Sequence, residues 1–196
     1  MMQILPWQPP SLSTQRLLLR PITLADAPAI FAYASNPMIS RYLPWQPHQD
    51  IQDSLKFIEE EIFASYAKEE PTLGICLKED TGCIIGTISC RLLDPHRFPH
   101  VRELAYALAE DQWGQGIVRE AAHCLISWVL DHYPDVLRIE AKTLAVNLGS
   151  ARVMQKLGMQ FEGSARAKIL HKDAYLDMEY YAILRDEFLK HARTQS

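Results

Sequence analysis

The sequence predicts an α+β domain, arranged as an α/β-type sandwich around a mixed, mostly antiparallel sheet. Two strand-like runs, 72–78 and 83–93, follow one another with only a short turn between them. The centre of the chain, from 101 to 142, reads as strand, helix and strand. Alternating apolar residues in 159–170 and 173–184 predict a final antiparallel pair. Runs of neighbouring strands around one strand–helix–strand unit are typical of this class.

The N-terminal third predicts one short strand and several helices. The strand occupies 16–21 and is closed by proline, and Thr23 with Asp26 in the first turn starts a helix that extends to Ala34. Prolines then divide the next segment into a turn and a short helix (Pro37, Pro44, Pro47). A longer amphipathic helix is expected over 50–68. Its apolar residues fall on one face (Ile51, Leu55, Ile58, Ile62, Phe63).

The second half predicts the elements that carry the chemistry. A strand over 101–109 leads through a glycine loop into a helix from 118 to about 132, and a further strand follows at 136–142. Asn147 is placed to cap a short helix that ends at Leu157, because Asn is a favoured N-cap residue. Gly158 is well placed as the residue that ends this helix. A short tail helix is expected after the terminal strand pair.

Length and composition indicate a single domain over residues 1–196, of a size that buries roughly 70% of its unfolded surface. The net charge of −4 and the lack of a basic block argue against a nucleic-acid binder. The four cysteines lack Cys-x-x-Cys spacing, and no histidine cluster has ligand spacing, so no metal is expected. No apolar run spans a bilayer and no signal peptide is recognisable, so we expect a cytoplasmic location. The sequence does not decide between a monomer and a homodimer.

The segment Asp111 to Val118 holds Gly-x-Gly at the junction of a strand and a helix. The first N–H groups of a helix have no intrahelical partner, and the helix dipole adds about half a positive charge there. Glycines let a phosphate approach this end closely. A tight structural turn explains the same glycines equally well, and a P-loop is excluded because no Gly-Lys-Ser/Thr ending follows.

Two motifs together resemble the GNAT superfamily of N-acetyltransferases, in its RimJ/RimL-like branch. The first resembles the family's phosphate loop (Trp113, Gly114, Gly116, Glu120, Ala121). The second follows about thirty residues later (Asn147, Ser150, Val153, Lys156, Leu157, Gly158, Met159). The resemblance covers the chain from about Arg16 to Leu184. It implies the GNAT fold, with about seven strands flanked by helices and a central parallel pair, 101–109 and 136–142, that splays apart to hold the cofactor.

The resemblance implies acetyl-CoA as co-substrate and a set of residues that bind it. These are main-chain groups of the preceding strand, the loop and the second motif (Leu108, Ala109, Gln112, Trp113, Gly114, Gln115, Gly116, Ile117, Val118, Asn147, Ser150). A main-chain N–H near Tyr106 to Leu108 is the expected donor to the developing oxyanion. One position departs from the family: many relatives carry Gln or Arg where this chain has Asp111, whose carboxylate should point away from the phosphates.

The acceptor must be a neutral amine when it attacks the thioester. Neutralising an α-amine of pKa ~7.7 at pH 7 costs about 1 kcal/mol, whereas a lysine of pKa ~10.4 costs about 4.6 kcal/mol. A carboxylate acting through water suffices for the former. Glu103 is the expected base, because it is the only acid within the central strand. An exposed strand glutamate is the alternative interpretation of this residue.

Asn147 and Ser150 are the other two expected catalytic residues. The resemblance places the Asn beside the pantetheine arm or the amine and the Ser near the cofactor, whereas a helix cap alone also explains Asn147. Many GNAT branches have a tyrosine in the following helix that protonates the thiolate, but residues 148–157 contain none. Ser150 or water would serve instead, or the thiolate would leave unprotonated.

The segment from Ile39 to Trp45 resembles the part of RimJ/RimL-like proteins that lines the acceptor side. Arg41, Tyr42 and Trp45 are the expected acceptor-binding residues, and a packed aromatic turn is the alternative. The sequence thus predicts an N-acetyltransferase that acetylates a primary amine by direct attack in a ternary complex. The expected acceptor is a protein N-terminus of the ribosomal-protein type. A small amine (antibiotic, polyamine or amino acid) and a non-catalytic acyl-CoA-binding module are the alternatives.

Overall fold

An eight-stranded sheet forms the centre of the computed structural model, which describes residues 7–171 and 173–193. The strands are arranged in the order β1-β2-β3-β4-β5-β6-β8-β7. Their bounds are Leu12–Ser13, Leu17–Arg20, Thr72–Leu77, Gly86–Arg91, Val101–Leu108, Arg138–Leu144, Gln160–His171 and Ala174–Leu184, for β1 to β8. All neighbours are antiparallel except β5 and β6, which run parallel. The predicted mixed sheet is confirmed, and the strand beyond the expected seven is the two-residue β1.

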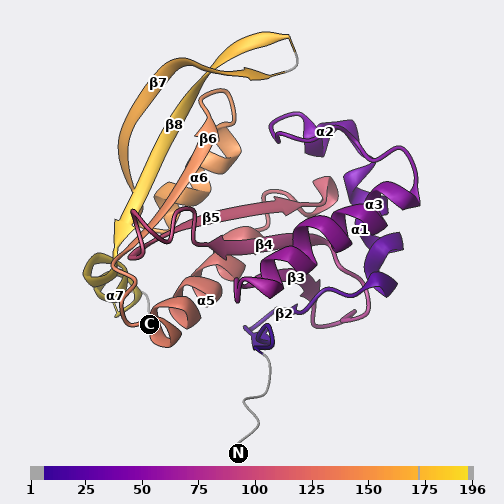
Figure 1. Ribbon diagram of the computed structural model, residues 1–196, viewed down its shortest axis with the longest axis horizontal. Coiled ribbons are helices and arrows are strands. Elements are labelled where there is room, and N and C mark those ends of the chain that lie inside the picture. The colour runs from indigo at the N-terminus through magenta and orange to yellow at the C-terminus, as the bar shows by residue number, and fades with distance from the viewer. Residues whose placement is uncertain (1–6, 172, 194–196) are drawn as a thin grey trace, which may run out of the picture.

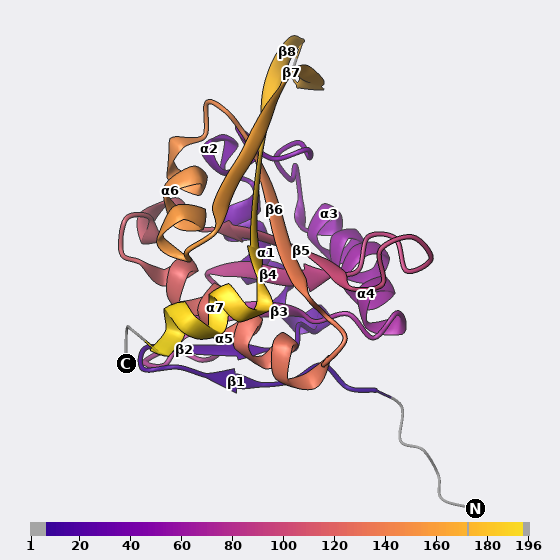
Figure 2. The ribbon, with the colours of Figure 1, turned by 90° about the vertical axis from the view of Figure 1, so that its left-hand side faces the viewer.

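Helices cover both faces of the sheet (Figures 1 and 2). One face carries α1, α2, α3 and α4, and the other carries α5, α6 and α7. Their bounds are Ala27–Ala34, Pro37–Ser40, Ile51–Phe57, Phe63–Ala67, Ile117–His132, Leu148–Lys156 and Arg185–Arg193, for α1 to α7. The core is therefore split into two apolar layers, one centred on α5 and the other on α1. The β7–β8 hairpin extends beyond the rest of the sheet (Figure 1).

Two expected elements differ from the structure. The helix predicted over 50–68 is interrupted by a π-helical turn at Ile58–Ile62, which separates α3 from α4. The turn buries both of these isoleucines, while Ile51 and Phe63 are 39% and 37% exposed and do not share the buried face expected of them. A π turn adds a residue, so a face predicted from a uniform period of 3.6 shifts there. The strand predicted over 83–93 spans only Gly86–Arg91, because the chain is still in a bend at Cys83 after the turn at 81–82 and is irregular at 84–85.

Candidate functional site

The loop between β5 and α5 holds its two glycines in a conformation that side chains disfavour. Gly114 has a φ of 76° and Gly116 a φ of 77°, both in the left-handed region. Gly116 is the N-cap of α5, so the N–H groups of Ile117 and Val118 point out of the helix end. The loop is open, because a Cβ at Gly114 would meet no atom within 4 Å. An open helix N-terminus of this kind can bind a phosphate group.

Side chains of the loop bond mainly to the loop itself. The Gln112 amide donates to the Asp111 carboxylate at 3.2 Å, and the Gln115 amide donates to the Asp111 carbonyl at 3.1 Å. Trp113, although 43% exposed, donates its indole N–H to the Leu108 carbonyl at 2.9 Å. The carboxylate of Asp111 is therefore held by a neighbouring amide, and the indole fixes the loop onto the end of β5.

Glu120 fixes the loop from the other side. Its carboxylate accepts hydrogen bonds from the Thr14 hydroxyl, from the Arg16 main-chain N–H at 3.0 Å and from Arg16 Nε at 2.7 Å. Arg16 also donates to the Gln115 carbonyl at 3.1 Å. Burial alone raises the pKa of Glu120, but the hydrogen bonds from Thr14 and Arg16 outweigh it and lower the pKa overall. The family-like glutamate is thus a structural residue that ties the loop to the β1–β2 turn.

Replacing Glu120 with glutamine should lower the free energy of unfolding by about 1.5–3 kcal/mol at pH 7, the usual range for hydrogen bonds to a charged group. The folded pKa is depressed, so the stabilisation is present above the unfolded pKa of ~4.3 and is lost as the pH falls through the folded pKa. Urea unfolding of both proteins from pH 7 to pH 3 measures this. A stability difference that grows on acidification would contradict it.

The parallel strands β5 and β6 pair only at their beginning. The register runs from Val101 opposite Arg138 to Glu103 opposite Glu140 and ends there. Beyond this point β5 continues along β4 to Leu108, while β6 continues along β8. The two strands therefore diverge beyond this point, as Figure 1 shows. The region between their two unpaired edges is called the slot below. The splayed pair that the resemblance implied is present.

Main-chain groups of β5 border this slot. Ala109 donates its N–H to the Ile85 carbonyl at 2.8 Å, so odd-numbered residues of β5 bond toward β4. Because alternate residues of a strand bond to opposite sides, Tyr106 and Leu108 direct their main-chain groups toward the slot, where the Leu108 carbonyl already accepts from the Trp113 indole. Ala109 also accepts from the Gln112 N–H at 3.1 Å, so both of its main-chain groups are engaged within the fold.

Glu103 lies at the fork where the two strands part. Its residue is only 6% exposed, and its carboxylate accepts a hydrogen bond from Lys142 Nζ of β6 at 2.8 Å. The alternative interpretation, an exposed strand glutamate, is therefore wrong. A buried carboxylate at this point faces an amine nitrogen across the diverging strands.

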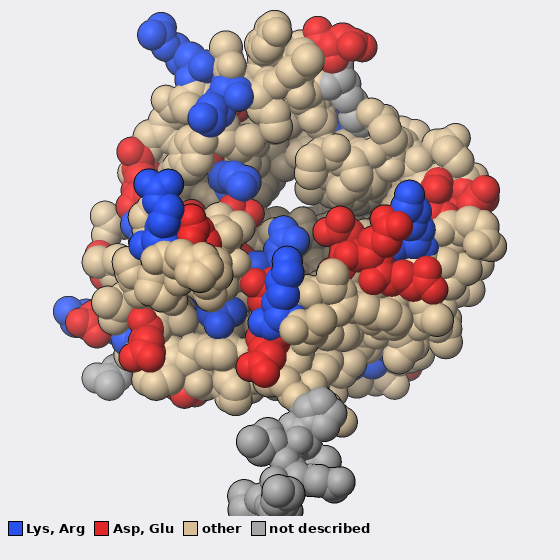
Figure 3. Space-filling model, viewed as in Figure 1, with Lys and Arg blue, Asp and Glu red and all other residues tan. Residues whose placement is uncertain are grey.

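A cavity of about 320 Å³ opens beside Glu103 and Lys142. Apolar and aromatic side chains line part of it (Leu93, Tyr180, Tyr181). Arg138 closes another part, where it bonds to Glu140 at 3.2 Å and forms a two-pronged pair with Glu162. The hydrogen bonds from Arg138 lower the pKa of Glu162. Figure 3 shows a hollow in the centre of this face of the molecule, between the β7–β8 hairpin and the region of α2.

Asn147 and Ser150 begin α6 on the other side of the slot. Asn147 caps the helix by accepting the Ser150 N–H at 3.2 Å, so the capping role is confirmed. The Ser150 hydroxyl lies 2.8 Å from the Tyr106 hydroxyl, which comes from β5. Burial raises the pKa of Tyr106 to about 12, although the bond to Ser150 lowers it slightly, so the phenol keeps its proton at neutral pH. A tyrosine hydroxyl therefore reaches this helix after all, from a strand rather than from the helix itself.

The expected acceptor-binding residues lie on the connection after α2. Arg41 is exposed, with its guanidinium 5.3 Å from the centre of the Tyr42 ring, and its carbonyl bonds to His171 of the β7–β8 hairpin at 2.8 Å. Trp45 packs against the α1 core and lies 5.5 Å from the His48 ring, as expected of a packed aromatic turn. Trp45 also lines an open hollow of about 600 Å³, which shares no lining residue with the cavity beside Glu103.

Neither a metal-binding cluster nor a membrane-spanning helix is present in residues 7–171 and 173–193. No three His, Cys, Asp or Glu side chains in this part of the chain come together as they would around a metal ion. None of the helices described there has the length and apolar character needed to cross a membrane. All four cysteines lie in this part of the chain, and they are free.

Comparison with known proteins decides the family. Residues 16–160 match the family model described as an acetyltransferase (GNAT) domain. The chain belongs to the GNAT family. It is similar to the uncharacterized N-acetyltransferase YoaA of Bacillus subtilis (strain 168), with 30% identity over 90% of this chain and 97% of YoaA. This GNAT protein is accordingly an N-acetyltransferase.

Solved GNAT structures share the fold. An acetyltransferase (GNAT family) from Bacillus anthracis superposes with a TM-score of 0.79 and 25% identity, over 91% of this chain and all of that one. RimL, a ribosomal L7/L12 α-N-protein acetyltransferase in complex with coenzyme A, has a TM-score of 0.80 and 20% identity over 91% of this chain and 99% of its own. The GNAT fold expected from the two sequence motifs is therefore confirmed.

Proposed function

We propose that this enzyme transfers the acetyl group of acetyl-CoA to the α-amine of a protein N-terminus, of the ribosomal-protein type. The observation that carries the proposal is the buried Glu103 carboxylate, 2.8 Å from the amine nitrogen of Lys142 at the fork of β5 and β6. The carboxylate of Glu103 is thus already placed to contact an amine nitrogen at the point where β5 and β6 part. RimL, a protein of the same fold, is described as an α-N-protein acetyltransferase, and this supports an N-terminal acceptor for the present enzyme.

Coenzyme A would bind by its pyrophosphate at the glycine loop, against the N–H groups from Gln115 to Val118. The open helix end and the two left-handed glycines support this placement. Its pantetheine arm would follow the slot edge of β5 at Tyr106 and Leu108, as an added strand does. Gln112 and Trp113 shape the loop, and Asn147 and Ser150 border the slot from α6.

Glu103 would take the proton from the acceptor amine, directly or through one water. The neutral amine then attacks the thioester carbonyl, the carbon–sulfur bond breaks and coenzyme A leaves as the thiolate. The second proton of the nitrogen leaves through water and restores the hydroxyl that protonates the thiolate. The Tyr106 N–H at the slot edge is a suitable donor to the oxyanion. The Ser150 and Tyr106 hydroxyls, 2.8 Å apart, would supply the thiolate with a proton. Asn147 positions Ser150 by capping the same helix turn.

Arg41 and Tyr42 would border the acceptor beyond the cavity, across from the β7–β8 hairpin, whereas Trp45 lines a separate hollow. The contact between Arg41 and His171, which joins the two segments, supports this. The free cysteines suit the reducing conditions of the cytosol, where we place the reaction. The cavity of about 320 Å³ lies at the small end of the range for ligand sites, so a small amine is the competing acceptor.

A panel of acceptors tests the proposal. The purified protein should acetylate a lysine-free peptide with a free N-terminus, and it should leave the same peptide with a blocked N-terminus and one added lysine unmodified. The lysine is the harder acceptor, because neutralising it at pH 7 costs about 3.6 kcal/mol more. Mass spectrometry of the products measures this. Turnover of polyamines or antibiotic amines without turnover of any peptide would contradict the proposed acceptor.

A further inference from the structure

We infer that Lys142 is a site of self-acetylation: when no external acceptor is bound, the enzyme transfers the acetyl group of acetyl-CoA to its own Lys142 Nζ. The modified residue lies inside the candidate active site, so the transfer takes place within one chain. The inference rests on the proposed function for the acetyl donor and for the base Glu103. It goes beyond that function because the acceptor is the protein itself.

Lys142 occupies the place of an acceptor amine. Its Nζ lies 2.8 Å from the Glu103 carboxylate, a distance at which a general base takes up a proton. Both side chains line the cavity of about 320 Å³. The Glu103 side chain is 8% exposed and that of Lys142 is 47% exposed, so the lysine, on its flexible stem, is the partner that can move. An external acceptor has to displace it to reach the same carboxylate.

The strand register places Lys142 close to the proposed position of the thioester. The parallel strands β5 and β6 last pair at Glu103 and Glu140. Lys142 follows two residues later on β6, so it is level with Ala105 of β5 and only about 3.3 Å of strand rise before Tyr106. The acetyl group is proposed to lie at the slot edge by Tyr106. Lys142 thus projects from the opposite side of the slot, beside both the base and the donor.

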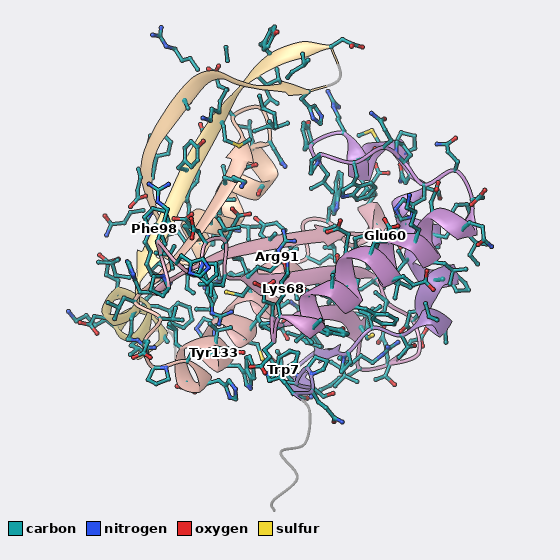
Figure 4. The ribbon with its side chains drawn as sticks, viewed as in Figure 1. Trp7, Glu60, Lys68, Arg91, Phe98 and Tyr133 are labelled. Atoms are coloured by element: carbon teal, nitrogen blue, oxygen red, sulfur yellow. The ribbon has the colours of Figure 1, made fainter. Side chains whose placement is uncertain are left out.

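Glu103 keeps a cationic neighbour without Lys142. Arg91, the last residue of β4, is directly opposite Glu103 in the antiparallel register. Opposed residues project to the same face of a sheet, with Cβ atoms about 4.5–5.5 Å apart. Figure 4 shows Arg91 in the middle of the face that carries α1 and α3. An arginine is permanently charged, so the buried carboxylate is not left without a cation when Lys142 moves or is acetylated.

Membership of the same chain compensates for the weak reactivity of a lysine. At pH 7 the neutral fraction of an amine of pKa ~10.4 is about 400-fold smaller than that of an α-amine of pKa ~7.7. Well-oriented groups within one molecule can react as if present at about 10⁵–10⁸ M. This advantage exceeds the deficit even against a peptide supplied at millimolar concentration. Acetylation of Lys142 is therefore consistent with a peptide lysine that stays unmodified.

The transfer balances as it does for an external amine. Glu103 takes one proton from the Lys142 ammonium, and the neutral Nζ then attacks the thioester carbonyl. The nitrogen–carbon bond forms as the carbon–sulfur bond breaks. The second proton lost by the nitrogen passes through water to the thiolate, and Glu103 releases its proton to water. The products are acetylated Lys142, coenzyme A and one proton.

Acetyl-CoA with an isotope-labelled acetyl group tests the inference on the full chain, without any added acceptor. Mass spectrometry of proteolytic peptides measures acetylation at each lysine, labelled and unlabelled groups together. Lys56 is the matched control, because it also lies beside a carboxylate, Glu60, at 3.9 Å, but its side chain is 68% exposed. Figure 4 shows Glu60 among the helices, on the side away from the β7–β8 hairpin. Lys142 should be acetylated at least tenfold faster than Lys56.

Two further measurements identify the transfer as enzymatic and internal. Glu103→Gln should slow acetylation of Lys142 at least tenfold, well within the usual contribution of a general base, while acetylation of Lys56 stays unchanged. Its unchanged affinity for coenzyme A shows that the variant is folded. The first-order rate constant for Lys142 should not change when the protein is diluted, because donor, base and acceptor belong to one complex.

Equal rates at Lys142 and Lys56, or equal rates at Lys142 in the wild type and in Glu103→Gln, would overturn the inference, because the modification would then be chemical. A rate constant that rises with protein concentration would also overturn it. A protein that acetylates the lysine-free peptide but never Lys142 would overturn the inference and leave the proposed function standing. Acetylation of Lys142 without turnover of any peptide would support the inference and contradict the proposed acceptor.

Discussion

Replacing Glu103 with glutamine should lower kcat for acetyl transfer by about 10²–10⁴-fold, the usual contribution of a general base. Glutamine keeps the size of the side chain and can still accept the hydrogen bond from Lys142, which is 2.8 Å away in the wild type. It cannot take a proton from the acceptor. Fixed-time assays with acetyl-CoA and a peptide acceptor measure the loss of kcat.

The affinity for coenzyme A separates this effect from misfolding. Because Glu103 lies at the fork, whereas the pyrophosphate site lies at the other end of β5, the dissociation constant should change less than twofold. Glu79→Gln, on the exposed turn after β3, is the matched control and should leave kcat unchanged. If Glu103→Gln retained full kcat, the base would have to be another group, and the fork would lose its proposed role.

Replacing Gly116 with valine should weaken coenzyme A binding at least tenfold. The residue has a φ of 77°, where a side chain costs about 1–2 kcal/mol or more and a β-branched one is a clear outlier. Relaxing that strain would move the N–H groups that begin α5, and the added side chain would crowd the Arg16 guanidinium, whose nitrogen lies 3.8 Å from a Cβ at this position. Isothermal titration with coenzyme A measures the change.

A glycine elsewhere provides the control for this variant. Gly82 lies in an exposed turn, and a Cβ there would approach only the Asp80 carboxylate, at an ordinary 3.5 Å. Gly82→Ala should therefore leave coenzyme A affinity and the thermal midpoint close to those of the wild type. Equal coenzyme A affinity in Gly116→Val and Gly82→Ala would show that the glycine loop is only a structural turn.

The order of elements could be predicted from local patterns, because strand alternation, prolines and caps act over a few residues. The strand over 101–109, the helix after the glycines and the Asn147 cap are all present. The π turn at Ile58–Ile62 could not be predicted, since the apolar pattern reads as one continuous helix. The splay of β5 from β6 came from the family resemblance and not from periodicity.

The side-chain contacts of the site are long-range and leave no local signal. Lys142 meets Glu103 across 39 positions of sequence, and Tyr106 meets Ser150 across 44. Only the sheet register brings Arg91 opposite Glu103. The contact of Tyr106 with the start of α6 could be inferred only once β5 and β6 are known to diverge. Tyr106 then lies on the part of β5 that faces α6.

Isothermal titration calorimetry of the pure protein with coenzyme A tests the central claim most directly. The claim is that the slot and the glycine loop form a cofactor site. The claim predicts saturable binding of one coenzyme A per chain, unchanged in Glu103→Gln and at least tenfold weaker in Gly116→Val. Binding heat that is absent in the wild type, or identical in all three proteins, would contradict it.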